Sequence, residues 1–147
     1  MKIEHDAWVV IADGRRALIT QNVGQLFAPK LEIRDRLEAP PNPSTQEQGT
    51  DKPGRSFDST SHRRSGVEQT DWHDQAESAF LAKVADRLEK LCQTEKVRRV
   101  VLVAAPRALA VLRAGMPTCV RQKTVAEVDK DYTKHSLPEV ERRLAEL

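Results

Sequence analysis

The chain has 147 residues and a formal net charge of +2, from 24 basic and 22 acidic side chains. Its length is typical of one domain with its own hydrophobic core, so we expect a single domain over residues 1–147. The balanced charge excludes binding to nucleic acid or membranes through bulk positive charge alone. No apolar run approaches the roughly 20 residues that span a bilayer, and the N-terminus lacks the apolar core of a secretory signal. We therefore expect a soluble cytoplasmic protein with no membrane partner.

The cysteines and histidines predict neither a metal site nor a cofactor. Cys92 and Cys119 form no C-x-x-C pair and have no zinc-ligand spacing. We interpret them as small buried hydrophobic side chains in a reducing compartment. The histidines are scattered along the chain and form no pair at metal-ligand spacing. They are His5, His62, His73 and His135.

The first forty residues predict a three-stranded antiparallel meander. Trp8–Ala12 is a short apolar run rich in β-branched residues, typical of a strand buried on both faces. The Asp13-Gly14 turn follows it, and Arg16–Gln21 forms the return strand. A third strand-like stretch runs from Leu26 to about Leu37.

The composition changes from Ala39 to about His73. This stretch is rich in Pro, Gly, Ser, Thr and Gln and has few large apolar side chains. It cannot bury enough surface to offset the entropy of ordering. We predict a long polar loop here. Loops of this length within a compact domain are usually functional or disordered.

Helical periodicity resumes after the loop. Asp74 and Glu77 have the spacing of a capping box, which predicts that a helix begins at Asp74 and runs to about Cys92. Apolar side chains recur along it at spacings of three and four residues, as expected for a buried stripe. The stripe consists of Ala76, Phe80, Val84, Leu88 and Leu91.

The last third of the chain predicts two more strands and two more helices. Val100–Ala104 is a second fully buried strand, and a short helix from Pro106 ends at Gly115. Val120–Val128 alternates as a strand does. A polar turn over 129–135, with Tyr132 half-buried, leads to a final helix capped by Ser136. Its predicted buried face consists of Leu137, Val140, Leu144 and Leu147.

Together these elements predict an α/β fold in the order β-β-β, long loop, α-β-α-β-α. A helical crossover places Val100–Ala104 parallel to a strand of the meander. The fold class is therefore a mixed five-stranded sheet flanked by helices.

Five segments in this order resemble the bacterial family of proteins required for attachment to host cells, the host attachment family. They are 8–17 (Trp-Val-Val-Ile-Ala-Asp-Gly-Arg-Arg-Ala), 53–59 (Pro-Gly-Arg-Ser-Phe-Asp-Ser), Phe80, 101–113 (Val-Leu-Val-Ala-Ala-Pro-Arg-Ala-Leu, then Leu-Arg) and 130–133 (Lys-Asp-Tyr-Thr). The resemblance covers nearly the whole chain. It implies a relation to the middle domain of archaeal and eukaryotic peptide-chain release factors, and hence a mixed sheet.

In release factors the loop after the meander carries a Gly-Gly-Gln tip that helps to hydrolyse peptidyl-tRNA. The present loop has no such tip, since its nearest strings are Gln48-Gly49 and Ser65–Gln69. The hydrolytic role therefore does not carry over. The chain also has no room for the codon-reading domain of release factors.

The long loop is the strongest candidate site in the sequence. Arginines there could hold phosphates through bidentate hydrogen bonds, and aromatic rings could stack on unpaired bases. Arginines also follow the Asp13-Gly14 turn, where a tight turn would display them at one end of the sheet. The candidate binding residues are Arg15, Arg16, Arg55, Phe57, Asp58, Arg63, Arg64 and Trp72. The alternative is a solvated loop and a turn with ordinary surface charges, because the loop is not net basic.

These observations leave three functions open. The leading hypothesis is a non-catalytic binding module that contacts the ribosome or RNA through its loop. The second is a protein-interaction factor that affects attachment to host cells, directly or through other proteins. The third is a hydrolase acting on RNA or peptidyl-tRNA, for which carboxylates at strand ends would have to meet around Mg²⁺. Those carboxylates are Asp6, Asp13, Asp129 and Asp131.

Overall fold

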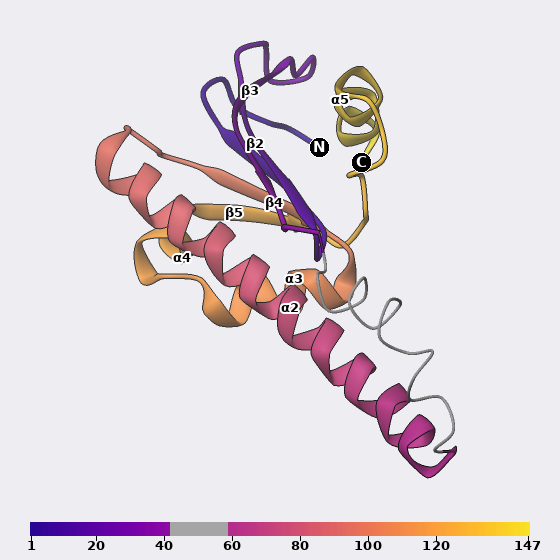
Figure 1. The fold of residues 1–147 in the computed structure, drawn as a ribbon. Helices are drawn as coiled ribbons and strands as arrows, with labels where there is room; N and C mark the ends of the chain where they lie inside the picture. Colours follow the sequence, from indigo (N-terminus) through magenta and orange to yellow (C-terminus); the bar gives the residue numbers. More distant parts are fainter. Residues whose placement is uncertain (42–58) are drawn as a thin grey trace.

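Five strands form one mixed sheet in the order β3-β2-β1-β4-β5. The computed structural model describes the backbone of residues 1–41 and 59–147, and the side chains of residues 1–41 and 73–147. β1 pairs antiparallel with β2 and parallel with β4, so the predicted mixed five-stranded sheet is confirmed (Figure 1). The strands are β1 Trp8–Ala12, β2 Arg16–Asn22, β3 Leu31–Glu38, β4 Val100–Ala104 and β5 Thr124–Val128.

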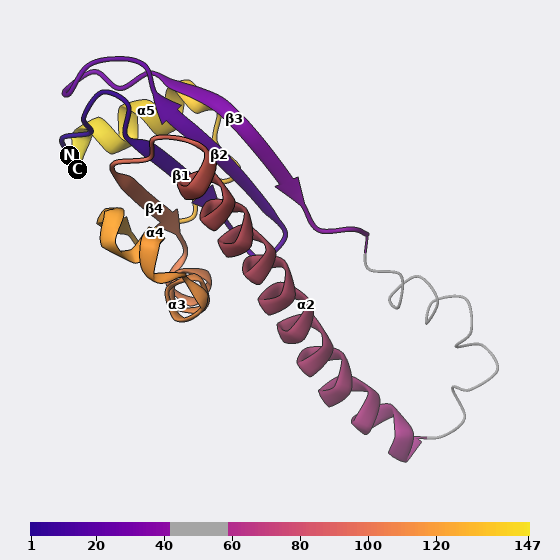
Figure 2. The same cartoon turned by 90° about the vertical axis from the view of Figure 1, so that its left-hand side faces the viewer.

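Helices cover both faces of this sheet. Helices α2, α3 and α4 lie on one face and α5 on the other (Figure 2). The helices are α2 Ser59–Thr94, α3 Pro106–Gly115, α4 Thr118–Lys123 and α5 Leu137–Glu146. Two helical layers are required because β1 and β4 are apolar on both faces, and each face must be shielded from water.

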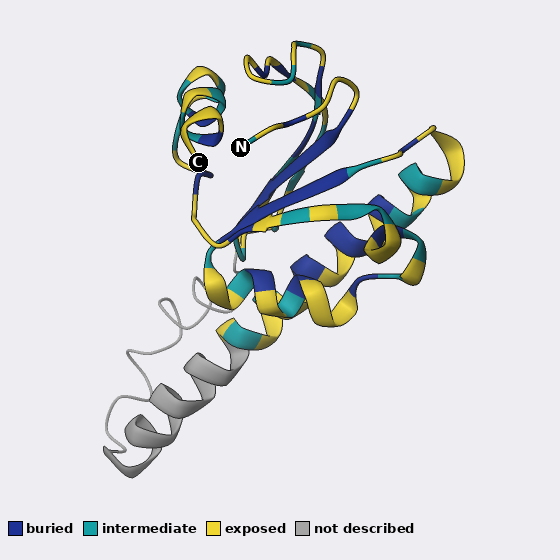
Figure 3. Cartoon of the chain, turned by 180° about the vertical axis from the view of Figure 1, so that it is seen from behind, coloured by how far each residue is buried: buried dark blue, intermediate teal, exposed yellow. Residues whose placement is uncertain are grey.

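The two central strands hold the core together. Val10 and Leu102 pack in the cluster under α2, whereas Val9 and Val103 pack in the cluster under α5. Both strands are buried along their whole length, as predicted (Figure 3). The middle of the sheet is therefore rigid, and the solvent-facing groups that could bind a ligand lie at its edges and ends.

The predicted start of the long helix at Asp74 is wrong. Helix α2 begins at Ser59, so residues 59–73 are helical and do not belong to the predicted loop. No proline lies between Pro53 and Pro106 to stop the helix there. The Asp74 carboxylate forms an ion pair with Arg107 of α3 instead of a cap. The predicted buried residue Ala76 is exposed.

The prediction of a strand over Val120–Val128 is wrong in its first part. Helix α4 precedes β5, and the backbone N–H of Val120 donates to the Pro117 carbonyl at 3.1 Å. Pro117 ends the preceding extended backbone and starts this turn of helix. Two further corrections concern burial: Tyr132 is fully buried rather than half-buried, and Leu147 is half exposed rather than buried.

The cap predicted for the final helix is confirmed. The Ser136 hydroxyl accepts a hydrogen bond from the Glu139 N–H at 3.4 Å, and Val140 and Leu144 are buried against the sheet. Within the part of the chain that the structure describes, no helix combines the length and apolarity needed to cross a membrane.

Candidate functional site

A cleft of about 610 Å³ lies between α2 and the end of β3, beside the β1–β2 turn. Its apolar wall comes from both elements, and its rim carries charged side chains. The lining residues used below are Gly14, Arg15, Leu37, Glu77, Phe80 and Lys83. The chain leaves β3 along this cleft through Pro40 and Pro41.

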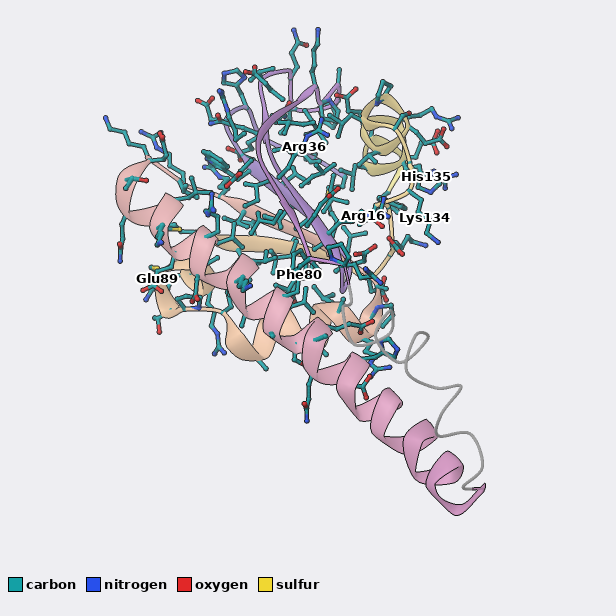
Figure 4. The ribbon with its side chains drawn as sticks, viewed as in Figure 1. Arg16, Arg36, Phe80, Glu89, Lys134 and His135 are labelled. Carbon is teal, nitrogen blue, oxygen red and sulfur yellow. The ribbon has the colours of Figure 1, made fainter. Side chains whose placement is uncertain are left out.

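The apolar wall follows from the alternation of β3. Leu37 is half-buried and packs against the core cluster that contains Phe80 of α2, so its side chain points to the α2 face. Its neighbours Arg36 and Glu38 therefore direct their side chains to the α5 face. Figure 4 shows Phe80 on α2 where the helix passes the sheet. Packed apolar side chains of β3 and α2 thus form the floor of the cleft, and its opposite side is open to solvent.

Along the same stretch of β3, the backbone groups of Arg36 and Glu38 are not bonded to β2, although the Arg36 N–H donates to the Asp35 Oδ1 at 2.8 Å. The Ala39 N–H donates to the Arg15 carbonyl at 2.7 Å, and antiparallel ladders alternate between bonded and non-bonded pairs. The N–H and C=O groups of Arg36 and Glu38 therefore face away from β2. No described strand lies on that side of β3.

The beginning of β3 is closed in a different way. The outward N–H of Leu31 donates to the Glu141 carboxylate of α5 at 2.6 Å. This bond removes a free donor from the edge and brings α5 against it. The open part of the edge is consequently confined to the end of β3 beside the cleft.

The cleft carries cations from two elements. Arg87 forms an ion pair with Asp35. The side chains of Arg15 and Lys83 form no ion pair with another described residue. Glu77 is the acidic group contributed by α2. Among the residues that the structure describes, the rim therefore offers the side chains of Arg15 and Lys83 as unpaired positive charges to a ligand.

Gly14 lets α2 approach the β1–β2 turn closely. A Cβ at this position would lie 2.6 Å from both Cγ and Cδ of Glu77, and the φ angle of Gly14 is negative.

We expect Gly14→Ala to lower the free energy of unfolding by about 1 kcal/mol, because Glu77 must move. The double variant Gly14→Ala, Glu77→Ala should recover the lost free energy of unfolding. Gly115→Ala, with nothing within 4 Å of its new Cβ, is the control and should be neutral or slightly stabilising in urea unfolding.

A polar network holds the same turn from the α5 side. The Asp13 Oδ1 accepts hydrogen bonds from the N–H groups of Arg15 and Arg16, each at 2.8 Å. Its Oδ2 lies 2.9 Å from the Thr133 hydroxyl, which is also 2.6 Å from Oδ1 of Asp131. The turn is thereby tied to the segment before α5. Asp131 and Thr133 of the 130–133 segment thus link the β1–β2 turn to the chain that leads into α5. The cap of α5 itself is Ser136.

Asp13 and Asp131 therefore do meet at the sheet end, across the Thr133 hydroxyl. Within the described residues, however, no three potential ligands gather in a group that could hold a metal ion. The geometry of the two carboxylates is accounted for by hydrogen bonds to protein donors.

The network predicts a pH dependence. Burial raises the pKa of Asp131, but hydrogen bonds from the hydroxyl and N–H of Thr133 outweigh it, so this pKa lies below its ordinary value. A carboxyl with a lowered folded-state pKa stabilises the fold above its unfolded-state pKa, and this contribution is lost as pH falls through the folded-state pKa. The wild type should exceed Asp131→Asn in stability at neutral pH, with the gap closing below about pH 4. Urea unfolding from neutral pH to below about pH 4 tests this prediction, with Asp129→Asn as the control. A stability difference between wild type and Asp131→Asn that does not change with pH would contradict it.

The structure places only part of the site predicted from sequence. Arg15 lies on the β1–β2 turn and Arg16 at the start of β2, and both are exposed. The remaining predicted binding residues lie outside the described side chains. Arg55, Phe57 and Asp58 fall in 42–58, and Arg63, Arg64 and Trp72 fall in the first part of α2. The sequence interpretation missed the cleft, because it depends on which strand is at the edge.

The fold and the cleft define a small mixed α/β domain in which the cleft lies beside the edge strand β3. The family model described as "Protein required for attachment to host cells" matches residues 8–144, which run from β1 into α5. The chain belongs to this family, and the resemblance drawn from its motifs is confirmed at that level. No curated protein matches the chain.

Proposed function

We propose that the chain is a non-catalytic protein-interaction module that binds an extended segment of a partner protein along the open end of β3. The observation that carries this proposal is the outward-facing backbone at the end of β3 beside an apolar cleft, where the Glu38 N–H has no partner among the described residues and the Arg36 N–H is bonded only to the Asp35 side chain. An extended peptide that adds to a sheet edge gains main-chain hydrogen bonds, and pockets beside the edge select its alternate side chains.

The cleft defines the chemistry of the preferred segment. Its apolar wall, to which Leu37 and Phe80 contribute, suits one apolar side chain of an added strand. Arg15 and Lys83 suit an acidic side chain on the same face of that strand. The segment should therefore carry an apolar and an acidic residue two positions apart, so that both side chains face the cleft. Membership in the attachment family fits this role if the partner is a protein that attachment requires.

Two substitutions at one position test the backbone interaction. Glu38→Pro removes the outward N–H and leaves the β2–β3 hydrogen bonds in place, as proline on an edge strand does. Glu38→Ala removes the side chain and keeps that N–H. We expect Glu38→Pro to weaken partner binding about tenfold or more, and Glu38→Ala to have a small effect.

The readout is capture of partners from a nuclease-treated extract of the source cells by the immobilised protein. The proposal requires a protein that wild type and Glu38→Ala retain and that Glu38→Pro loses, with all three proteins folded by circular dichroism. Equal retention by all three variants would contradict binding at this edge.

Contact with the ribosome or RNA is the second candidate, and the β1–β2 turn favours it. Asp13 fixes the backbone of Arg15 and Arg16, and both side chains are exposed to solvent. Exposed guanidinium groups on a fixed turn suit phosphate oxygens. The family's proposed relation to the release-factor middle domain points in the same direction.

Co-sedimentation with ribosomes at two salt concentrations tests this second function. Replacing Arg15 and Arg16 by Gln should weaken binding and reduce the slope of log K against log salt by roughly 1 to 2. Lys96→Gln with Arg98→Gln removes the same charge at the other end of the sheet and is the control. Equal losses in both variants would show a general charge effect, and no sedimentation at low salt would contradict ribosome binding.

A further inference from the structure

Two outward-facing backbone donors of β3 are already occupied by carboxylates of the chain itself. The Leu31 N–H donates to Glu141 of α5 at 2.6 Å, and the Arg36 N–H donates to Oδ1 of Asp35 at 2.8 Å. Charged side chains directed at an edge strand are one way in which proteins prevent pairing with other strands. Of these outward N–H groups and that of Glu38, only the Glu38 group has no partner among the described residues.

The Asp35 carboxylate that occupies the Arg36 N–H is held in place by α2. Its Oδ2 accepts a hydrogen bond from Arg87, whose side chain lines the cleft, while Oδ1 accepts the bond from the strand. Asp35 and Leu37 lie two positions apart on β3, so both side chains lie on the α2 face. The Asp35 side chain is 24% exposed, which limits the access of water to both bonds. The carboxylate thus bridges α2 and the edge strand beside the cleft.

We propose that Asp35 is an autoinhibitory group that competes with a partner strand for the Arg36 N–H. The inference rests on the proposed function, because it requires that a strand adds to this edge. A carbonyl of the partner would accept the Arg36 N–H, and the Asp35 carboxylate would turn away from the strand while keeping its bond to Arg87. The edge would then offer two donors, at Arg36 and Glu38, instead of one.

This competition makes binding at the edge selective. Each partner must replace a hydrogen bond to a charged acceptor, which is stronger than a bond to a neutral carbonyl. A partner that makes only main-chain contacts gains little from the replacement. A partner that also places an apolar side chain in the cleft and a carboxylate near Arg15 and Lys83 offsets the loss. Asp35 therefore favours acidic extended segments with an apolar side chain on the same face over strands that lack these groups.

The first test measures amide exchange in the free protein by NMR, with each rate normalised to that of the unfolded chain. Asp35→Ala should speed exchange at Arg36 about fivefold or more and leave Leu37, which is bonded to β2, unchanged. Glu32→Ala removes one negative charge from the same strand, where Glu32 pairs with Arg34, and is the control. It should not change exchange at Arg36. Equal rates at Arg36 in wild type and Asp35→Ala would overturn the inference without any ligand being present.

The second test measures the affinity for a peptide with the sequence Val-Thr-Glu-Thr written twice, the length of β3. Asp35→Ala should bind this peptide about fivefold more tightly than wild type or Glu32→Ala does. In its complex the amides of both Arg36 and Glu38 should be protected from exchange. Asp35→Asn keeps the size of the side chain and should show a smaller gain in the same direction, so it tests the inference if the alanine variant is unstable.

The outcomes of the peptide experiment distinguish this inference from the proposed function. Protection of Glu38 with equal affinity in wild type and Asp35→Ala would overturn the inference and leave edge binding in place. Protection of Glu38 in neither protein would contradict edge binding itself, and the inference would fail with it. Tighter binding by Asp35→Ala without protection at Arg36 would show an effect of charge alone and would also overturn the inference.

Discussion

Phe80→Ala is expected to lower the free energy of unfolding by about 3–5 kcal/mol. The ring is 4% exposed and packs between α2 and the sheet, in the cluster that includes Val10 and Leu102. Removing it leaves a cavity in the layer that attaches α2 to the sheet, and the rigid central strands cannot collapse to fill it. It would also open the wall of the cleft.

Equilibrium unfolding in urea measures this loss. Phe80→Leu keeps most of the apolar volume and is the matched control, with an expected loss of about 1 kcal/mol. A Phe80→Ala variant within 1 kcal/mol of wild type would mean that α2 is not packed on the sheet as described. Partner binding by Phe80→Leu should remain close to wild type, since the backbone edge is unchanged.

Thr133→Val is expected to cost about 2 kcal/mol, although it preserves the shape of the side chain. The hydroxyl of this buried residue lies within hydrogen-bonding distance of both Asp13 and Asp131. Hydrogen bonds to charged groups contribute more than neutral ones, and valine would leave both carboxylates without this donor. The β1–β2 turn would lose its tie to the segment before α5.

Thr133→Ser keeps the hydroxyl and removes the methyl group, so it separates the contributions of these two groups to stability. It should lose well under half as much stability as Thr133→Val, and amide exchange at Arg15 and Arg16 should remain slow. In Thr133→Val the Asp13 Oδ1 bonds remain possible, so exchange at these amides should rise only moderately. Equal stability of the Val and wild-type proteins would show that the network contributes nothing measurable.

The sheet was predictable because its signals are local. β1 and β4 are apolar runs with turn residues at their ends, and a helical crossover between them dictates parallel pairing. Ser136 and Glu139 likewise marked the final helix by a cap with defined spacing. In each of these cases the residues that decide the structure lie close together in the sequence.

The errors came where tertiary contacts decide. Asp74 looked like an N-cap, but its carboxylate pairs with Arg107, which the sequence places 33 residues away. Val120 fitted an alternating strand, but it fills the space under α2 as part of a short helix. Capping and alternation describe local preference, and tertiary packing overrides them.

In the candidate site, too, the features set by local sequence were predicted and those set by tertiary contacts were not. Arg15 and Arg16 were found from the turn that precedes them, because a turn displays its side chains wherever it sits. The open end of β3 could not be found, since it requires knowing that β3 is an edge strand and that Glu141 closes only its beginning.

The most direct test of edge binding is amide hydrogen exchange, followed by NMR, with and without a ligand peptide. The probe is a peptide of 8 residues, the length of β3, with the sequence Val-Thr-Glu-Thr repeated, which places valine and glutamate on one face; the same peptide with lysine for glutamate is the control. We predict that the valine–glutamate peptide protects the amide of Glu38 most, while Leu37, already bonded to β2, changes little, and Arg36, bonded to the Asp35 side chain, changes less than Glu38. Protection confined to other residues, or none at saturating peptide, would contradict binding at this edge.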